Sequence, residues 1–370
     1  MKIRGAVLEE SGRTRPYKES RPLTISELEL DSPESNELVV QIEIAGICHS
    51  DLSVVNGDRP RPLPMLLGHE ASGRVIDVGE GINDVSIGQR VVMTFLPRCG
   101  TCVQCGTNGR LPCERGTVAN NEGRLMGGRR LHRDGSLVQH HLGVSAFATH
   151  ALVDRRSVVP VSDDIPPEVA AMLGCAILTG GGALLNAARP EKGNSVAIVG
   201  LGGVGMVALL VAQALGTGSV VGIDSQPDKL NSALSLGAHR AYTPEEALDA
   251  EVKADVVIEA AGHPRAFETA VQLTAPGGSM TTVGLPSPSA KSTIHPLGLT
   301  TEARVIQGSY LGSAVPDRDV PLFAQMWREG RLPVERLISS TLHLEQINEA
   351  MDVLAEGQAI RQLIRFESES

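Results

Sequence analysis

Aromatic residues are scarce in this chain of 370 residues, which has one tryptophan, three tyrosines and five phenylalanines. Its cores must therefore be aliphatic, and the interleaving of aromatic and basic residues that marks many nucleic-acid surfaces is missing. Basic residues are also in the minority, with 33 Lys and Arg against 43 Asp and Glu and a formal net charge of −10. This balance argues against a nucleic-acid partner.

Long uninterrupted apolar runs are scarce as well, and we expect no signal peptide. No uninterrupted apolar run reaches the roughly 18 residues that span a bilayer, and Met1–Gly5 opens no signal-peptide h-region. All six cysteines can be given metal-binding roles, which fits a reducing compartment better than a secreted disulfide scaffold. We therefore expect a cytoplasmic protein with no membrane partner, and the length suggests two domains of roughly 150 residues or more.

Four of the cysteines fall within fifteen residues and form the most informative pattern in the chain. They are Cys99, Cys102, Cys105 and Cys113. One loop can fold four thiolates around a tetrahedral zinc ion. An iron–sulfur cluster is the alternative, but bacterial ferredoxin spacing closes with x3-Cys-Pro, whereas here seven residues precede the last cysteine and Pro112 comes before it. The spacing favours zinc, and a site closed by four thiolates is structural.

The pattern of apolar residues changes along the chain. The first 150 or so residues contain short strand-like runs, such as 38–44 and 90–95, between glycine-rich turns. From residue 195 the sequence predicts alternating strands and helices. The predicted strands are 196–199, 220–223, 256–259 and 280–283, and the predicted helices are 204–215, 228–236 and 266–273. This alternation is typical of parallel βαβ units, so the fold class is α/β.

A glycine-rich turn follows the first of these strands. Gly200, Gly202 and Gly205 form a GxGxxG motif that opens the apolar helix. These glycines allow a tight turn, close approach of a pyrophosphate and close packing of helix on strand. The next strand ends at Asp224, where a carboxylate binds the ribose 2′-hydroxyl of NAD and repels a 2′-phosphate. The sequence therefore favours NAD over NADP.

Two cysteines remain outside the four-cysteine lobe. Two thiolates and one imidazole are a recognised ligand set for catalytic zinc, and Cys48, His69 and Cys175 would make that set. Spacing cannot establish it, because these residues lie far apart in the chain. On residue type alone, Cys175 between Gly174 and Ala176 is more often an inert core residue.

Together these motifs resemble the zinc-dependent alcohol dehydrogenases of the medium-chain dehydrogenase/reductase (MDR) family. The resemblance runs from about residue 5 to Phe366. It is carried, in order, by the segments 46–51 (GICHSD), 68–70 (GHE), 99–113, 173–175 (LGC) with 179–180, 200–205 (GLGGVG) and 360–361. It implies a GroES-like β-rich catalytic domain, residues 1–176 and 312–370 with a structural-zinc lobe at 97–115. It also implies a Rossmann domain, a doubly wound parallel sheet that binds NAD, at residues 177–311.

The resemblance implies that Cys48, His69 and Cys175 bind a catalytic zinc, so that two zinc ions are expected per subunit. Many family members have a histidine three residues after the serine or threonine that relays the proton. Here that position is Ser53, so the route of the proton stays open.

Other site residues follow from the same resemblance. Ser50 would bond to the alcohol oxygen and pass its proton on, Asp51 would hold the zinc-bound histidine, and Glu70 would lie behind the metal. His49 and Arg361 would hold the coenzyme pyrophosphate, Thr179 would lie near the nicotinamide, and Phe95 would line the substrate pocket. The remaining implied coenzyme contacts are Gly203, Val204, Lys229 and Val283.

The expected activity is reversible oxidation of primary aliphatic or benzylic alcohols to aldehydes with NAD. One alternative is a thiol-linked formaldehyde dehydrogenase, in which Arg115, Arg124, Arg129 and Arg130 could recognise an anionic thiol, although such charge runs are usually solvated. A remote alternative is a non-catalytic zinc-ribbon redox sensor. The long segment 113–147 resembles the dimeric branch of the family, so we expect a homodimer, with a homotetramer as the other possibility.

Overall fold

The computed structural model describes residues 1–367, and its contacts divide the chain into two compact units. The first unit comprises Met1–Thr107, Pro112–Cys175 and Ile338–Ser370, and the second comprises Asn108–Leu111 and Ala176–Leu337. Residues 368–370, with which the first expected domain ends, lie outside the described residues.

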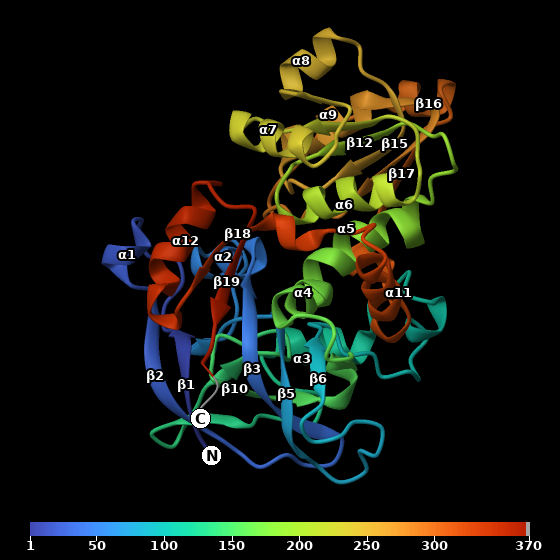
Figure 1. Cartoon of the computed structure of the whole chain (residues 1–370). Coiled ribbons are helices and arrows are strands. Elements are labelled where there is room, and N and C mark those ends of the chain that lie inside the picture. Colours follow the sequence, from blue (N-terminus) through green and yellow to red (C-terminus); the bar gives the residue numbers. More distant parts are fainter. Residues whose placement is uncertain (368–370) are drawn as a thin grey trace. The chain divides into compact units, whose positions relative to one another are not determined.

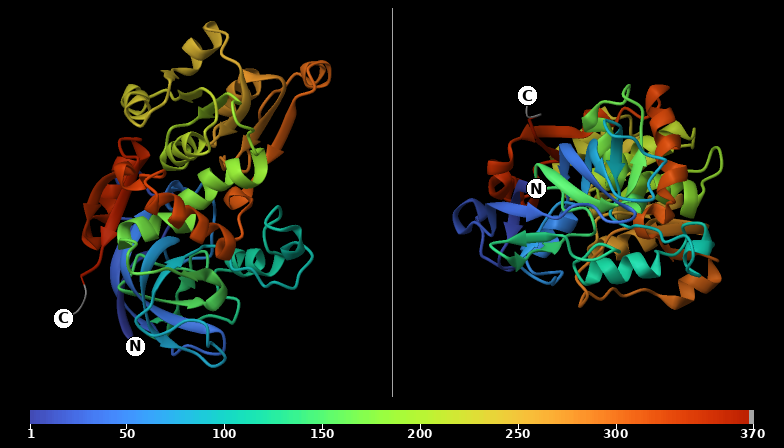
Figure 2. Two further views of the ribbon diagram at one scale, coloured as in Figure 1. Left: turned by 45° about the vertical axis from the view of Figure 1, so that its right-hand side comes forward. Right: turned by 90° about the horizontal axis from the view of Figure 1, so that it is seen from below.

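The first unit is built from two β-sheets. The strand order is β8-β7-β2-β1-β4-β9 in one sheet and β11-β6-β5-β3-β19-β18 in the other, where β10 also pairs with β3. The strands are β1 Lys2–Leu8, β2 Leu23–Leu30, β3 Glu37–Ile47, β4 Met65–Leu66, β5 Glu70–Val78, β6 Arg90–Met93, β7 Leu131–Arg133, β8 Ser136–Leu137, β9 Gln139–His140, β10 His150–Asp154, β11 Val158–Pro160, β18 Ile338–Leu342 and β19 Arg361–Arg365. Strands β3 and β19 pair antiparallel although they come from opposite ends of the chain, as the blue and red ribbons in Figures 1 and 2 show.

Helices complete this unit around the strands, and α4, Pro167–Met172, described below, is one of them. The others are the short α1 Tyr17–Ser20, α2 His49–Val55, α3 Glu114–Asn121 and α12 Ile347–Ala355. The amphipathic stretch 344–356 therefore forms a helix, and the strand that follows it, β19, returns to the main sheet.

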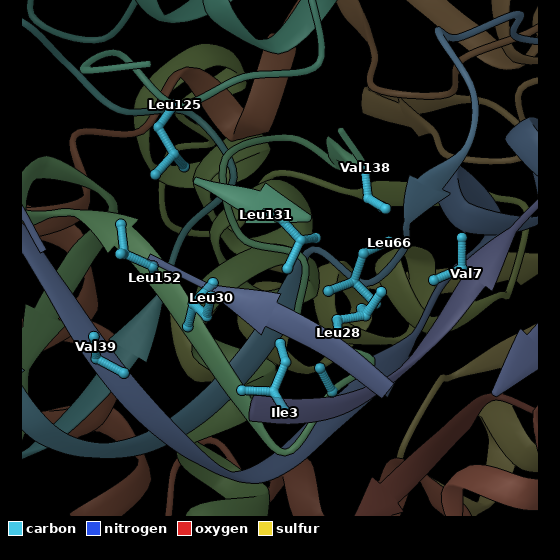
Figure 3. Packing of buried hydrophobic residues seen from close by; sticks show 11 residues of the cluster. Ile3, Val7, Leu28, Leu30, Val39, Leu66, Leu125, Leu131, Val138 and Leu152 are labelled. Atoms are coloured by element: carbon cyan, nitrogen blue, oxygen red, sulfur yellow. The ribbon is translucent and has the colours of Figure 1, made fainter. Parts of the chain in front are cut away.

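The core of the first unit is aliphatic, as the shortage of aromatic residues requires. Alternate residues of β1 and β2, such as Ile3 and Val7 or Leu28 and Leu30, point into one buried cluster (Figure 3). This period of two is the pattern of strands with one face buried. Val39 and Leu152, from the paired strands β3 and β10, join the same cluster, so it is shared by strands of both sheets.

The second unit contains one parallel sheet of order β14-β13-β12-β15-β16-β17. Its elements are β12 Val196–Val199, α6 Gly203–Ala214, β13 Val220–Ile223, α7 Pro227–Ser235, β14 Arg240–Tyr242, α8 Pro244–Asp249, β15 Ala254–Glu259, α9 Pro264–Leu273, β16 Thr274–Thr282, α10 Pro296–Thr301 and β17 Val305–Gly308. The chain runs outward from β12 through β13 to β14 and then returns to β15 on the other side of β12. The strand order therefore reverses at β12, where doubly wound sheets bind ligands, and the expected Rossmann fold is confirmed.

The boundary expected at residue 312 differs from the contact-based division, which keeps residues 312–337 in the second unit. The reason is helix α11, Pro316–Arg328, which packs on α5, Leu178–Gly182. A Cβ atom on Gly181 would lie 2.5 Å from the Phe323 ring, so the glycine leaves the space that this ring fills.

One continuous helical stretch, Pro167–Ala188, is long and apolar enough to cross a membrane, although the sequence predicted no membrane-spanning segment. However, 83% of its most apolar 18-residue segment is buried inside the structure, as in the core helix of a folded domain. It consists of α4 Pro167–Met172, a π-helical turn Leu173–Ile177, α5 and a second π-helical turn Ala183–Ala188.

Candidate active site and metal centres

Cys48, His69 and Cys175 come together within the first unit. Their ligand atoms all lie within 4.8 Å of one another, and Cys175 Sγ is 3.5 Å from His69 Nε2. All three side chains are buried. Two sulfurs and one imidazole nitrogen at this spacing fit zinc, with one coordination position left for a non-protein ligand.

Each of the three residues is placed by a local backbone feature. Cys48 follows β3 as the N-cap residue of α2. His69 precedes β5 and follows Gly68, which has φ +93° and whose Cβ would lie 2.5 Å from the Phe147 nitrogen. Only glycine adopts that conformation in that space without strain.

Cys175 lies in the π-helical turn between α4 and α5. The preceding residue, Gly174, has no room for a side chain, because a Cβ there would lie 2.0 Å from the Met93 carbonyl oxygen. The helix therefore approaches β6 closely at this turn. Single π-turns inside α-helices are frequent at functional sites.

Asp51 connects two of these residues. Its Oδ2 accepts a hydrogen bond from the Cys48 backbone N–H at 3.1 Å, and its Oδ1 lies 2.9 Å from His69 Nδ1. Burial opposes ionisation of this carboxyl, but His69 and His141 outweigh that effect and lower the pKa of Asp51. The bond to Asp51 orients the imidazole so that Nε2 faces the two sulfurs.

His141 is a buried residue of the same group that sequence reasoning missed. Its Nδ1 lies 3.3 Å from Asp51 Oδ1, and its ring meets the His69 ring edge-on at 5.6 Å. No motif marks this residue. The only signal was a pair of histidines, 140 and 141, directly followed by an apolar leucine.

Glu70 and Arg361 form a buried pair close to Cys48 and His69. Burial raises the pKa of Glu70 to about 7, although Arg361 opposes the shift, with its Nη1 3.4 Å from Glu70 Oε2. Both side chains are buried. The guanidinium of Arg361 also reaches the Ile47 carbonyl oxygen at 3.5 Å, and its contact with a coenzyme pyrophosphate stays a prediction.

The residues expected at the substrate are placed as follows. Ser50, in the first turn of α2, is partly exposed, and the preceding His49 is exposed. Phe95 meets the His69 ring edge-on at 5.6 Å, and its carbonyl oxygen accepts a hydrogen bond from the Asn120 side chain at 2.7 Å. Ser53, at the position where many relatives have histidine, donates its hydroxyl to the His49 carbonyl oxygen.

The four cysteines of the lobe form a second cluster. Their sulfurs lie within 4.8 Å of one another, with Cys99 to Cys105 and Cys102 to Cys113 both at 3.9 Å. Backbone N–H groups of Cys99 and Gly116 point at the Cys113 sulfur, at 3.3 and 3.4 Å. Such donors stabilise thiolate charge, so the donor set and its surroundings fit a closed zinc site.

The glycine-rich turn has the geometry of a dinucleotide site. Gly200 has φ +92°, and a Cβ on Gly205 would lie 1.8 Å from the Gly200 oxygen, whereas a Cβ on Gly202 would meet nothing within 4 Å. Helix α6 begins after Gly202 without a side-chain cap. Its N-terminal N–H groups and the space at Gly202 suit a pyrophosphate.

Asp224 follows β13 beside this turn. It accepts hydrogen bonds from the backbone N–H groups of Leu201 at 2.7 Å and Gln226 at 3.0 Å. These bonds fix the carboxylate against the glycine turn, in the position that suits a ribose 2′-hydroxyl.

The other expected coenzyme residues lie in the same unit. Thr179 is the one residue of α5 that is not buried. Val283, directly after β16, is buried, and Lys229 in α7 is partly exposed. Their contacts with a coenzyme stay predictions.

A surface cavity of about 670 Å³ lies elsewhere on the first unit and contains none of the zinc-ligand candidates. Its lining includes Arg115, Arg124 and Arg156 with Glu114 and Asp154. Arg156 is held by Asp154 at 2.6 Å, so the cavity wall carries charges of both signs.

Comparison with known proteins agrees with this geometry. Residues 34–163 match the alcohol dehydrogenase GroES-like domain, and residues 203–328 match the zinc-binding dehydrogenase domain. Geraniol dehydrogenase of Castellaniella defragrans is 36% identical over 93% of this chain and 95% of that protein. NDMA-dependent alcohol dehydrogenase of Amycolatopsis methanolica is 31% identical over 98% of this chain and 99% of that protein.

Among solved structures, benzyl alcohol dehydrogenase from Acinetobacter calcoaceticus superposes with a TM-score of 0.90 at 27% identity, covering 99% of this chain and 100% of that one. The chain therefore belongs to the zinc-dependent alcohol dehydrogenases of the MDR family. It is an oxidoreductase that acts on alcohols and contains a zinc-binding dehydrogenase domain.

Proposed function

We propose that this protein is a zinc- and NAD-dependent dehydrogenase that reversibly oxidises primary alcohols to aldehydes, with Cys48, His69 and Cys175 as ligands of the catalytic zinc. The observation that carries the proposal is the buried cluster of these three donors. A closed structural site has four protein ligands, whereas three leave a position for the alcohol oxygen. The second zinc would be held by the four-cysteine lobe.

The bound zinc would supply Lewis acidity toward the alcohol oxygen, and the nicotinamide would accept the hydride. The residues of the chain would supply position and proton transfer. Ser50, partly exposed two residues after Cys48, would accept the alcohol proton and pass it outward. Asp51 would keep His69 in the tautomer whose Nε2 faces the sulfurs.

The preference for NAD would come from Asp224. Its carboxylate is fixed by the Leu201 and Gln226 N–H groups, so it cannot easily turn away from a 2′-phosphate. The neighbouring residues 225–228, Ser-Gln-Pro-Asp, offer no arginine that could pair with such a phosphate.

We propose allylic and benzylic primary alcohols as the preferred substrates. The relatives named geraniol dehydrogenase and benzyl alcohol dehydrogenase support this class. Phe95, edge-on to the His69 ring, would provide one aromatic wall for a flat substituent next to the reacting carbon.

The thiol-linked formaldehyde dehydrogenase is less well supported. Three of the four arginines that could bind an anionic thiol are engaged by polar groups of the first unit. Arg124 binds Glu122 at 2.6 Å, Arg129 bonds to Gln139 at 3.3 Å, and Arg130 binds Glu37 at 2.9 Å.

We also propose a homodimer, in which the edge strand β17 would pair with a second copy of the chain. This strand is the edge of the parallel sheet, with Val305 exposed, and Leu297 in the preceding helix α10 is exposed as well. An edge strand with apolar neighbours can pair with a second copy. We also propose a reducing, cytoplasmic location, because none of the six cysteines forms a disulfide and all six belong to the proposed zinc sites.

The test is NADH formation with geraniol, benzyl alcohol, hexanol, a secondary alcohol, and formaldehyde with and without glutathione or mycothiol. We expect turnover of the first two alcohols without added thiol, and its loss in Cys48→Ser. The matched control is Thr101→Ser, a substitution of similar size in the four-cysteine lobe, which should keep activity. Absence of turnover with every alcohol, in protein that holds zinc, would refute the proposal. Turnover only of formaldehyde plus thiol would transfer the assignment to the thiol-linked branch.

A further inference from the structure

Asp51 faces two histidines instead of one. Its Oδ1 lies 2.9 Å from His69 Nδ1 and 3.3 Å from His141 Nδ1, and all three side chains are fully buried. A carboxylate without access to water depends on such donors for its charge and orientation. The contact with His141 is the longer one, and it lies within ion-pair distance but is not a regular hydrogen bond.

The loop after His141 holds that residue by its own backbone. The His141 N–H donates to Ser145 Oγ at 2.8 Å, and the His141 carbonyl oxygen accepts from the N–H groups of Val144 and Ser145 at 3.1 and 3.2 Å. Leu142 and Ser145, both buried, have φ of +51° and +54°. Residues other than glycine rarely adopt this backbone conformation, which is strained for them. Such strain persists where the surrounding structure imposes it, commonly at functional sites.

The same loop is joined to the segment that carries His69. The Ala146 N–H donates to the Gly68 carbonyl oxygen at 3.1 Å, and the Phe147 N–H donates to the Leu67 oxygen at 3.0 Å. His141 is therefore held at Asp51 by backbone bonds to the residues directly before the ligand.

We propose that His141 is a positioning residue of the catalytic zinc site, which it serves as the second donor to Asp51. By holding this carboxylate, it fixes both the His69 ring and the Cys48 backbone N–H, the two groups that Asp51 contacts. The inference rests on the ligand set proposed above. A separate metal site at Asp51, His69 and His141 is not required, because His69 Nδ1 is used by Asp51 while Nε2 faces the sulfurs.

The neighbouring His140 provides a matched control. It is equally buried, but among residues 1–367 its ring nitrogens make no hydrogen bond, whereas His141 Nδ1, which also lacks a regular hydrogen bond, lies 3.3 Å from Asp51 Oδ1. We compare His141→Leu, which removes the donor, with His141→Asn, whose amide can replace Nδ1–H, and with His140→Leu.

The readout is zinc retention by the full-length protein against a chelator, without substrate or coenzyme. We expect His141→Leu to keep one zinc as the wild type does and to hold the other roughly 10 to 100 times more weakly, the usual effect of losing an outer-shell partner. His141→Asn should restore most of the affinity, and His140→Leu should match the wild type. We expect Cys48→Ser to lack the catalytic zinc, so adding His141→Leu to this variant should not change its zinc retention further.

Wild-type zinc retention in His141→Leu would overturn the proposal, as would equal weakening in His140→Leu, which would indicate a general packing effect. Lack of rescue by His141→Asn together with a lowered melting temperature would also count against it. Because no alcohol is involved, failure of the substrate assay would leave this result standing. Retention of both zincs by Cys48→Ser would instead refute the ligand set itself.

Discussion

His140 should make this protein sensitive to mild acid. Burial, together with the charges of Arg130, Arg129 and His132, lowers the pKa of His140 from 6.5 to about 4. The ring is almost fully buried, and neither nitrogen has a hydrogen-bond partner among residues 1–367. In the unfolded chain the same group would titrate near its ordinary value.

The sign of the effect follows from this difference. Between about pH 6.5 and pH 4 the unfolded state binds a proton at His140 that the folded state does not. The stabilising contribution is therefore complete above the unfolded pKa and is lost as the pH falls toward the folded value. A difference of about 2.5 pK units corresponds at most to about 3 kcal/mol, and about 2.5 kcal/mol of it should be lost by pH 4.5.

The assay compares wild type with His140→Leu in equilibrium unfolding from about pH 8 to about pH 4.5. Leucine has similar bulk and no titrating group, so the stability of His140→Leu should fall less steeply, and the difference in unfolding free energy between the two proteins should change by about 2.5 kcal/mol over this range. Loss of zinc in acid affects both proteins and cancels in the difference. Parallel curves for wild type and His140→Leu would refute the reasoning.

Three further predictions concern the coenzyme turn and the four-cysteine lobe. Gly202→Ala should fold normally, because its Cβ meets nothing within 4 Å, but it should bind NAD at least tenfold more weakly. Gly205→Ala should also lower the melting temperature, because its Cβ would lie 1.8 Å from a carbonyl oxygen. Equal NAD affinity of Gly202→Ala and wild type in a fluorescence titration would contradict this prediction. Asp224→Ser should raise KM for NAD about tenfold and reduce the preference for NAD over NADP, since a charged hydrogen bond is worth about 1.5 kcal/mol or more. If the ratio of kcat/KM for NAD to kcat/KM for NADP is unchanged, another group determines the coenzyme preference. Cys102→Ser should remove one of two zinc ions and lower the melting temperature, and full zinc content by elemental analysis would exclude the closed site.

The sequence predicted most reliably what lies close together along the chain. The four cysteines of the lobe and the turn at Gly200–Gly205 are each formed by one short segment, so spacing alone brings their groups together. Four of the six strands of the parallel sheet were also predicted, because buried strands and apolar helices alternate there. The bounds of β12 and β13 agree with the prediction, whereas β16 begins six residues earlier than predicted and the edge strands β14 and β17 were not predicted. Cys48, His69 and Cys175 could only be joined by resemblance, because they come from a helix N-cap, a strand start and a π-turn.

What the sequence did not predict depends on contacts between distant segments. The assignment of residues 312–337 rests on the fit of Phe323 at Gly181, and neither residue indicates the other. His141 is a similar case. Its position follows from left-handed residues in the next turn, where Leu142 and Ser145 give no sign of that conformation because glycine or asparagine would be expected.

Asp51 shows why the metal site and the local fold cannot be separated. With Cys48 at the N-cap and Asp51 three residues later, the segment forms a capping box, yet the usual N-cap residues are serine, threonine, aspartate and asparagine. Because cysteine is not a usual N-cap residue, the sequence pattern did not predict that a helix begins here. The same carboxylate that caps the helix also orients His69, so a single side chain determines where α2 begins and which nitrogen of the histidine faces the sulfurs. Substitution of Asp51 must therefore perturb both the helix and the site, whereas substitution of His141, which approaches Oδ1 and not the Oδ2 that accepts the Cys48 N–H, leaves the capping carboxylate in the chain.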